Sequence, residues 1–222
     1  MLRFFKQLKF FFIALIVLSA IIILVFYNIL DVEKPLPIYQ PNRIDASLVD
    51  SSIQHKKKYH TIADFKLINQ NGDTITQDTY EDKIYVADFF FTTCQTICPI
   101  MTDQMHRVQE EIKDDDEIML LSHSVTPEID SVEQLKRYAI EKGVLDQKWN
   151  LVTGDRKQIY DLARKSYLVV KHDDSEDYGM VHTENFALID KKRQIRGIYN
   201  GVSPTSVDSL LQDIQKLKKE YQ

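Results

Sequence analysis

The stretch from residue 87 to residue 99 reads ADFFFTTCQTICP and contains both cysteines of the 222-residue chain, Cys94 and Cys98. Its first half is a short apolar run rich in aromatic residues, which predicts a buried strand. Pro99 suits the first position of a following helix, where its missing N–H would be unpaired in any case. Two thiols at a junction between a strand and a helix are placed for redox chemistry or for binding a soft metal ion.

The composition narrows the classes of function. The chain is 44% hydrophobic and 27% charged, as is usual for a globular protein, and its formal net charge is −5. A protein that binds nucleic acid would carry a basic excess, so no nucleic-acid partner is expected. The length of 222 residues is enough for one globular domain and an additional segment.

The N-terminus predicts a membrane anchor. Residues 10–30 contain no charged side chain and are long enough to cross a hydrocarbon core of about 30 Å as a helix. Residues 1–9 are basic, and acidic residues first appear at Asp31 and Glu33. This asymmetry places residues 1–9 in the cytoplasm and the bulk of the chain on the extracytoplasmic, periplasmic side of the inner membrane. A cleaved signal peptide would have a shorter apolar core followed by small residues, whereas this run ends in YNIL.

Residues 31–58 are expected to be a linker, and residues 59–222 the globular domain. The linker holds three of the six prolines and ends in three lysines, which is typical of a partly extended tether. His55 and His60 flank these lysines, and both are expected to be solvated.

Within residues 59–222, short apolar runs alternate with segments of helical periodicity, which predicts an α/β domain with parallel strand pairs. Asn71-Gly72 marks a hairpin near the start, and a basic turn marks a second hairpin near the end. This order predicts a thioredoxin-like fold with added β-hairpins, in which the thiols lie at a helix N-terminus that stabilises thiolate. Strands are expected at 62–68, 74–76, 84–91, 118–125, 149–152, 186–190 and 195–199.

The spacing C-x-x-x-C is one residue longer than that of a thioredoxin-type disulfide exchanger. Residues four apart on a helical turn project from nearly the same face, so Cys94 and Cys98 can meet one ion, and thiolates select copper(I) or zinc. A structural zinc site needs four protein ligands, which two cysteines do not supply. A structural disulfide over so short a loop would remove little entropy from the unfolded chain.

A third ligand would then be a histidine, of which the chain has six. His182 lies just before the apolar run that begins at Asn185, and in a thioredoxin-like fold the loop entering that strand lies beside the thiols. A lone histidine there can also be structural, but the thiol pair and the loop position together favour a ligand. The sequence therefore predicts a metal site formed by Cys94, Cys98 and His182.

Other candidate residues have simpler interpretations. Met101 and Met105 fit the buried face of a helix, together with Val108 and Ile112. His106 is expected in solvent and His123 in the interior of a strand. Asp88 has two interpretations that the sequence leaves open: it is buried beneath the thiols with a raised pKa, or it caps an edge of the sheet.

These motifs resemble the Sco/SenC family in both order and spacing. That family consists of membrane-anchored, thioredoxin-fold, copper-binding proteins linked to the assembly of cytochrome c oxidase, and the resemblance implies copper binding at Cys94, Cys98 and His182. The family commonly has Val-Asp-Pro where this chain has Thr126 as the middle residue, and a proline often stands where this chain has Gln95. The resemblance covers residues 59–219 and rests on residues 88–99, 124–128, 151–154 and 181–183.

The resemblance implies a metallochaperone that delivers copper to, or matures, the dinuclear copper site of a cytochrome c oxidase subunit. That subunit and a thioredoxin-like reductant would be its partners. An extracytoplasmic thiol-disulfide oxidoreductase is the alternative, since the fold and the helix-terminal thiols suit it equally, although the longer cysteine spacing and His182 argue against it. A peroxidase is a weaker candidate, because its usual proline-threonine pattern and arginine are not evident around Cys94. Enzymatic activity is left open.

Overall fold

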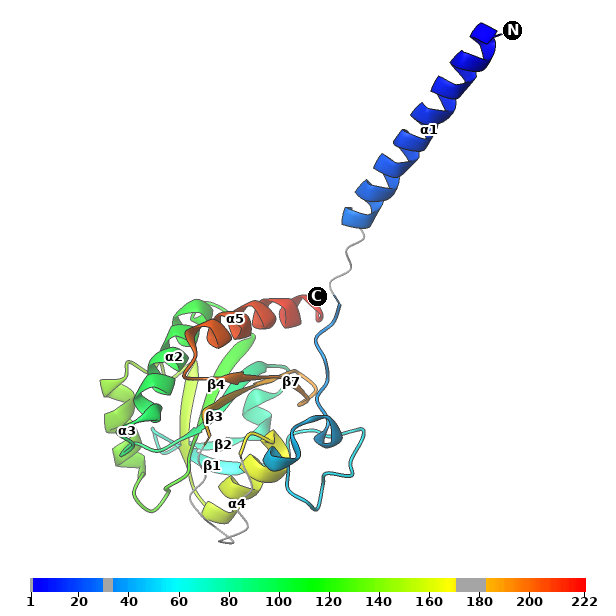
Figure 1. The fold of residues 1–222 in the computed structure, drawn as a ribbon. Helices are drawn as coiled ribbons and strands as arrows, with labels where there is room; N and C mark the ends of the chain where they lie inside the picture. Colours follow the sequence, from blue (N-terminus) through cyan, green and yellow to red (C-terminus); the bar gives the residue numbers. More distant parts are fainter. Residues whose placement is uncertain (1, 30–33, 171–182) are drawn as a thin grey trace. The chain divides into compact units, whose positions relative to one another are not determined.

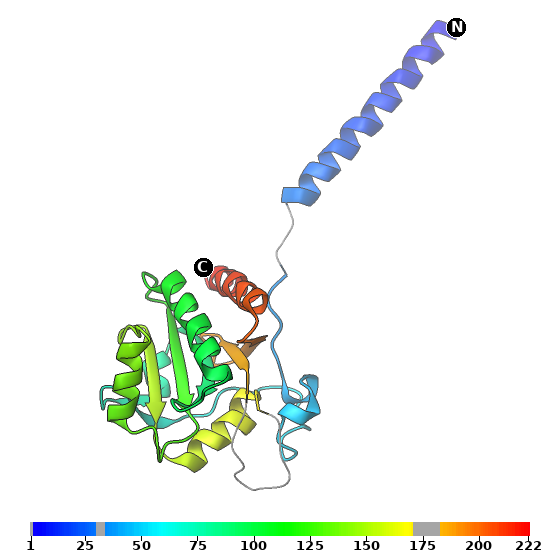
Figure 2. The same ribbon diagram turned by 60° about the vertical axis from the view of Figure 1, so that its left-hand side comes forward.

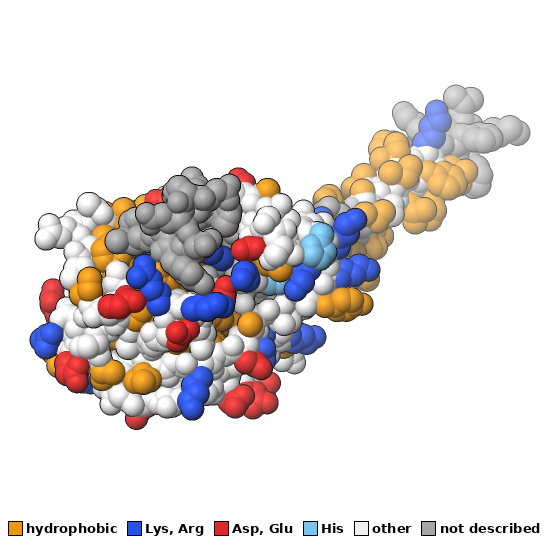
Figure 3. Space-filling view, turned by 90° about the horizontal axis from the view of Figure 1, so that it is seen from below, with side chains coloured by type: hydrophobic (Ala, Val, Ile, Leu, Met, Phe, Trp, Pro, Cys, Tyr) orange, Lys and Arg blue, Asp and Glu red, His pale blue; other side chains and the backbone are white. Residues whose placement is uncertain are grey.

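The computed structural model covers the 222-residue chain and describes residues 2–29, 34–170 and 183–222. The chain divides into two compact units, Met1–Pro35 and Leu36–Gln222. In the first unit, helix α1 (Leu2–Ile29) contains the span Leu8–Phe26, which by length and composition could cross a membrane. Its large apolar side chains are exposed and gather along the helix, as Figure 3 shows, so they offer a surface suited to lipid.

The second unit is built on a mixed sheet, in which the described residues form seven strands in the order β2-β1-β5-β4-β3-β6-β7 (Figure 1). Strands β3, β4 and β5 are parallel neighbours, whereas the pairs β1–β2 and β6–β7 are antiparallel hairpins. The predicted thioredoxin-like α/β arrangement with added hairpins is confirmed. The strands are β1 (Lys66–Asn69), β2 (Thr74–Thr76), β3 (Ile84–Phe90), β4 (Ile118–Ser124), β5 (Trp149–Thr153), β6 (Asn185–Ile189) and β7 (Ile195–Asn200).

Helices cover both faces of this sheet (Figures 1 and 2). Apolar side chains of α2, α3 and α5 pack together on one face, and those of α4 and the helical turn that follows it pack on the other. Strand β3 is buried along its whole length and feeds alternate side chains into these two cores. The helices are α2 (Ile97–Ile112), α3 (Val132–Glu141), α4 (Arg156–Asp161) with the π-helical turn η4 (Leu162–Tyr167), α5 (Pro204–Lys219), and the short 3₁₀ turns η1 (Pro41–Arg43), η2 (Ala46–Leu48) and η3 (Gln77–Tyr80).

The predicted start of the helix after the thiols differs from the observed one. Helix α2 begins at Ile97, with Thr96 as its N-cap, so Pro99 occupies the third helical position rather than the first. Proline is accommodated there because the N–H groups of the first turn have no partner within the helix. Cys98 therefore lies inside the first turn of α2, and Cys94 lies in the turn that precedes it.

The structure also corrects most of the predicted linker. The compact domain begins at Leu36, and Leu36, Val49 and Ile53 are buried in its core. Two peptide oxygens at residues 36 and 37 accept hydrogen bonds from the guanidinium of Arg196, which is itself buried. Residues 36–58 thus pack as a strap on the domain through apolar residues spaced among prolines and polar residues. Of the predicted linker 31–58, only residues 31–35 lie outside this unit.

His60 differs from its predicted solvent exposure for the same reason. Its side chain is buried, and Nε2 lies 2.7 Å from the carbonyl oxygen of Ser166 in the π-helical turn. Burial lowers the pKa of His60, because the charged form would lose its hydration. His55, by contrast, is exposed as predicted.

Candidate metal centre

The two cysteines lie together where β3 ends and α2 begins. Cys94 closes a turn in which its N–H donates to the carbonyl oxygen of Phe91 at 3.3 Å. The N–H of Cys98 then points at the Cys94 sulfur, 3.5 Å away, and the Thr96 hydroxyl lies at the same distance from that sulfur. Both thiols are free; Cys94 is partly exposed and Cys98 is buried.

The two thiols differ in acidity. Desolvation opposes ionisation of Cys94, but hydrogen bonds from the Thr96 side chain, the backbone N–H groups of Cys98 and Thr96, and the Cys98 thiol outweigh it and lower the pKa to about 7. Burial raises the pKa of Cys98 to about 12, even though a backbone hydrogen bond from Phe91 favours its thiolate. The site therefore holds one partly exposed thiol whose pKa lies near neutral pH and one buried thiol that stays protonated there.

Asp88 is buried below the thiols, which decides between its two interpretations. Strand β3 lies between β4 and β6, so Asp88 is not at a sheet edge. Burial raises the pKa of its carboxyl to about 7, against a hydrogen bond from Ser122 that favours the charged form. Oxygen Oδ1 is buried and, among the described residues, has no hydrogen-bond partner. Its charge would further raise the pKa of Cys98.

His182 lies outside the described residues, so its role as a ligand stays a prediction. The next residue, Thr183, is buried, and its hydroxyl donates to the carbonyl oxygen of Val169 at 2.6 Å. The amide of Asn185 donates to the same oxygen at 3.1 Å. The chain entering β6 is therefore fixed, immediately after His182, to the carbonyl oxygen of Val169, two residues beyond the π-helical turn.

The other candidate ligands have structural roles. His123 is fully buried, stacks on Phe89 with ring centroids 4.6 Å apart, and has its pKa lowered to about 4 by burial. Met101 and Met105 are buried on α2, as predicted, and His106 is partly exposed. Among the described residues, no group of three or more His, Cys, Asp or Glu side chains could hold a metal ion.

Sequence reasoning missed Asp130, which lies on the loop between β4 and α3. Its side chain is completely buried and accepts hydrogen bonds from the backbone N–H and the hydroxyl of Thr92. It also accepts from the hydroxyls of Ser124 and Thr126. The only signal in the sequence is a hydroxyl-rich stretch with two acids, Glu128 and Asp130, which looks like an ordinary polar loop.

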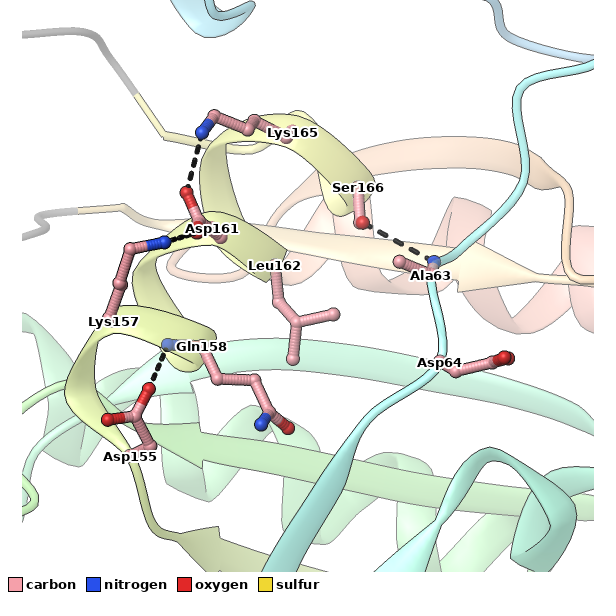
Figure 4. Close-up of a pocket in the computed structure, with 9 residues that line it drawn as sticks. All are labelled: Ala63, Asp64, Asp155, Lys157, Gln158, Asp161, Leu162, Lys165 and Ser166. Atoms are coloured by element: carbon pink, nitrogen blue, oxygen red, sulfur yellow. Dashed lines mark hydrogen bonds and ion pairs between the residues drawn. The ribbon is translucent and has the colours of Figure 1, made fainter.

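A pocket of about 390 Å³ lies elsewhere on the domain, between α4 and the segment that leads into β1 (Figure 4). Its two lysines, Lys157 and Lys165, are both paired with Asp161, at 2.8 and 2.7 Å. The lining includes neither a cysteine nor a histidine. The pocket therefore offers no soft donor, and the thiol junction is the candidate metal centre.

A mixed sheet covered by helices, with two cysteines where a central strand enters a helix, defines a thioredoxin-like domain specialised in thiol or metal chemistry. The family model described as SCO1/SenC matches residues 53–219. The chain belongs to the SCO1/SenC family.

Known relatives agree with this assignment. The SCO1 protein homolog of Bacillus subtilis is 31% identical over 159 residues, which cover 70% of this chain and 82% of the relative. The solved structure of BsSco is 31% identical, covers 71% of this chain and 93% of its own, and superposes with a TM-score of 0.61; BsSco is described as having a disulfide switch and as a member of the Sco family of cytochrome c oxidase assembly proteins. The structure of Bradyrhizobium japonicum ScoI with copper bound is 25% identical, with coverages of 69% and 98% and a TM-score of 0.55.

Proposed function

We propose that this protein binds copper through Cys94, Cys98 and His182 and delivers it to, or matures, the dinuclear copper site of a cytochrome c oxidase subunit. The observation that carries the proposal is the pair of free thiols whose sulfurs converge at the start of α2. It is supported by membership of the SCO1/SenC family and by the copper bound to the related ScoI.

The donor set suits copper as a cargo. Thiolates are soft ligands that hold copper(I), and an added imidazole would allow copper(II) to bind as well. Three ligands of mixed softness leave a position open for a ligand of the acceptor protein. Because Cys94 is partly exposed and ionises near pH 7, it is the sulfur from which an acceptor could first take the ion.

We further propose that α1 anchors the protein in the inner membrane by a single span, with the copper-binding domain on the periplasmic side. The apolar span Leu8–Phe26 supports the anchor, and the basic residues of segment 1–9 support the orientation. An acceptor site in a membrane-bound oxidase would then lie within reach of the anchored domain.

A copper titration of the full chain, reduced and held in detergent, tests the proposal. We expect one copper per chain and a sulfur-to-copper(II) charge-transfer band, and we expect Cys94→Ser and Cys98→Ser each to abolish that band. His182→Ala should weaken binding by at least about tenfold. His106→Ala is the matched control, because His106 is a partly exposed histidine of α2 outside the site. A stoichiometry unchanged in both His182→Ala and Cys94→Ser would refute copper binding at this site.

A thiol-disulfide oxidoreductase is the second candidate, favoured by the different acidities of the two thiols. A sulfur with a pKa near 7 can attack a target disulfide, and the buried sulfur behind it can then resolve the mixed disulfide. Its partner in turnover would be a thioredoxin-like reductant. Reduction of a disulfide-containing peptide separates the two functions: turnover that survives His182→Ala but not the loss of either cysteine would favour the reductase.

A further inference from the structure

Asp130 is the centre of a buried hydrogen-bond cluster that joins two loops. Its carboxylate accepts from the Thr92 N–H at 3.2 Å, and from the hydroxyls of Thr92 at 2.6 Å, Ser124 at 2.5 Å and Thr126 at 3.0 Å. We call Thr92, Ser124, Thr126 and Asp130 the Asp130 cluster. Its carboxylate is completely buried, so each of these donors replaces a water molecule that the group gave up on folding.

The cluster closes on itself around Thr92. The side-chain amide of Gln134, on the first turn of α3, donates to the Thr92 hydroxyl at 3.0 Å, so that hydroxyl both accepts and donates. The Thr126 N–H donates to the Ser124 hydroxyl at 3.2 Å. Hydrogen bonds arranged in such a network strengthen one another and hold a single geometry.

Thr92 is two residues before Cys94, and its neighbour Phe91 contacts both cysteines. The carbonyl oxygen of Phe91 accepts from the Cys94 N–H, and a backbone hydrogen bond from Phe91 reaches the Cys98 sulfur. A shift of Thr92 would therefore move Phe91, and with it both thiols. Thr92, the cluster member next to Phe91, is bonded to Asp130 in the loop that follows β4.

Thr126 also has a defined place in this cluster. It stands where the family commonly has an aspartate, and in this chain its hydroxyl donates to Asp130. A carboxylate has no proton to donate at neutral pH, so an aspartate could not make this bond. Thr126 is therefore a further hydrogen-bond donor to Asp130.

We propose that Asp130 is a positioning residue for the thiol pair: through Thr92 it holds the Cys94 turn against the loop between β4 and α3, so that the two sulfurs are set for their common chemistry before any copper binds. This inference rests on the proposed function only for its consequence, tighter copper binding. The arrangement of the thiols in the metal-free protein is a separate consequence that can be measured alone.

The test compares Asp130→Asn with wild type in the full chain, first without metal. The protein is equilibrated with reduced and oxidised glutathione, where one glutathione disulfide takes two electrons and two protons from Cys94 and Cys98 to give one protein disulfide and two glutathiones. We expect Asp130→Asn to lower the equilibrium constant for this disulfide about tenfold, because a loosened turn lowers the effective concentration of one thiol near the other. Copper affinity should fall about tenfold in parallel.

Three further variants make the test decisive. Thr92→Val removes the same hydroxyl contact from the other side, so its effect should match that of Asp130→Asn, and the double variant should be no worse than either alone. Thr92→Ser keeps the hydroxyl and should restore the wild-type equilibrium. Ser131→Ala is the control for stability, because it removes the N-cap of α3, where the Ser131 hydroxyl accepts from Gln134, and leaves the cluster intact.

The outcomes separate the two proposals. If Asp130→Asn and Thr92→Val leave the disulfide equilibrium unchanged, or shift it no more than Ser131→Ala does, Asp130 has a structural role only and the inference fails. If the equilibrium shifts as expected in a protein that does not bind copper, the inference stands and the copper proposal fails. Should Asp130→Asn not fold, Thr92→Val and Thr92→Ser alone decide the result.

Discussion

Two buried aspartates lie close to the thiol junction, one in strand β3 and one in the loop after β4, and their surroundings are opposite. Asp88 is 2% exposed, and its oxygen Oδ1 has no hydrogen-bond partner among the described residues. Asp130 is 0% exposed and accepts four hydrogen bonds. Equal burial therefore has unequal consequences: Asp88 is held at a cost that depends on its charge, whereas Asp130 organises the residues around it.

Replacing Asp130 should have the largest effect. Asp130→Ala leaves one N–H and three hydroxyls around an apolar gap, and buried donors without acceptors are costly. We expect the free energy of unfolding of the reduced protein to fall by about 4 kcal/mol. Denaturant unfolding measures this loss. A loss below about 1 kcal/mol would show that water replaces the carboxylate freely. Hydrogen bonding would then not explain the difference between Asp130 and Asp88.

Replacing Asp88 should instead increase the free energy of unfolding. Because folding raises the pKa of its carboxyl from 3.8 to about 7, the native state binds the extra proton between these values, and its stability is lost as the pH rises through that window. Asp88→Asn removes this titration. The variant should resemble wild type near pH 4 and become more stable than wild type by up to about 4 kcal/mol at pH 8, since each unit of pKa shift is worth about 1.4 kcal/mol.

The measurement for Asp88→Asn is denaturant unfolding of the reduced protein at pH 4, 6 and 8. Ser122→Ala is its companion, because Ser122 supplies the hydrogen bond that favours the charged carboxylate. Losing that bond should increase the pH dependence of stability rather than remove it. A gap between Asp88→Asn and wild type that is constant with pH would mean that the carboxyl does not titrate in this window.

The contrast between the two aspartates also shows what the sequence can predict. Asp88 lies within an apolar run, so its burial beneath the thiols was one of two interpretations that the pattern itself suggested. Asp130 lies in a stretch of serine, threonine, proline and glutamate, where local pattern indicates only a solvated loop. Its partner Thr92 is 38 residues away, and such a pairing becomes visible only when the strands are placed side by side.

The same limit explains the strap at residues 36–58. The strands, the helix faces and the thiol junction follow from periodicity and spacing, which are local properties of the chain. The packing of Val49 and Ile53 on the domain depends on contacts with residues far along the sequence, and their isolated apolar side chains show no period. His60 was predicted to be solvated for the same reason, because its partner, Ser166, is 106 residues away along the chain.

A smaller effect is expected at Thr126, which is only partly buried and contributes one hydroxyl to the Asp130 cluster. Thr126→Val removes one of four hydrogen bonds to the carboxylate and keeps the shape of the side chain. The free energy of unfolding should fall by about 1 kcal/mol. Ser124→Ala, which removes a completely buried hydroxyl with the same acceptor, should cost more, and the reverse order would show that burial does not set the strength of these bonds.

The smallest effect is expected at His123, a third buried group that can ionise. Like Asp88, it has a buried atom, Nε2, without a hydrogen-bond partner among the described residues. Unlike Asp88, it is neutral near pH 7, because burial lowers its pKa to about 4. Folding thus removes the charge from His123, and the stability that its neutral form provides is lost only as the pH falls below its unfolded value of 6.5.

His123→Phe should therefore change the free energy of unfolding at pH 7 by no more than about 1 kcal/mol. The ring keeps its stacking on Phe89, and the loss of the contact between Nδ1 and the Asp88 carbonyl oxygen is offset by removal of the unpaired Nε2. Below pH 6 the variant should gain on wild type, since phenylalanine has no proton to exclude. A loss of several kcal/mol at pH 7 would instead mean that the neutral imidazole is a required hydrogen-bonding group. The charge states of Asp88 and His123 alone would then not explain why the two residues affect stability differently.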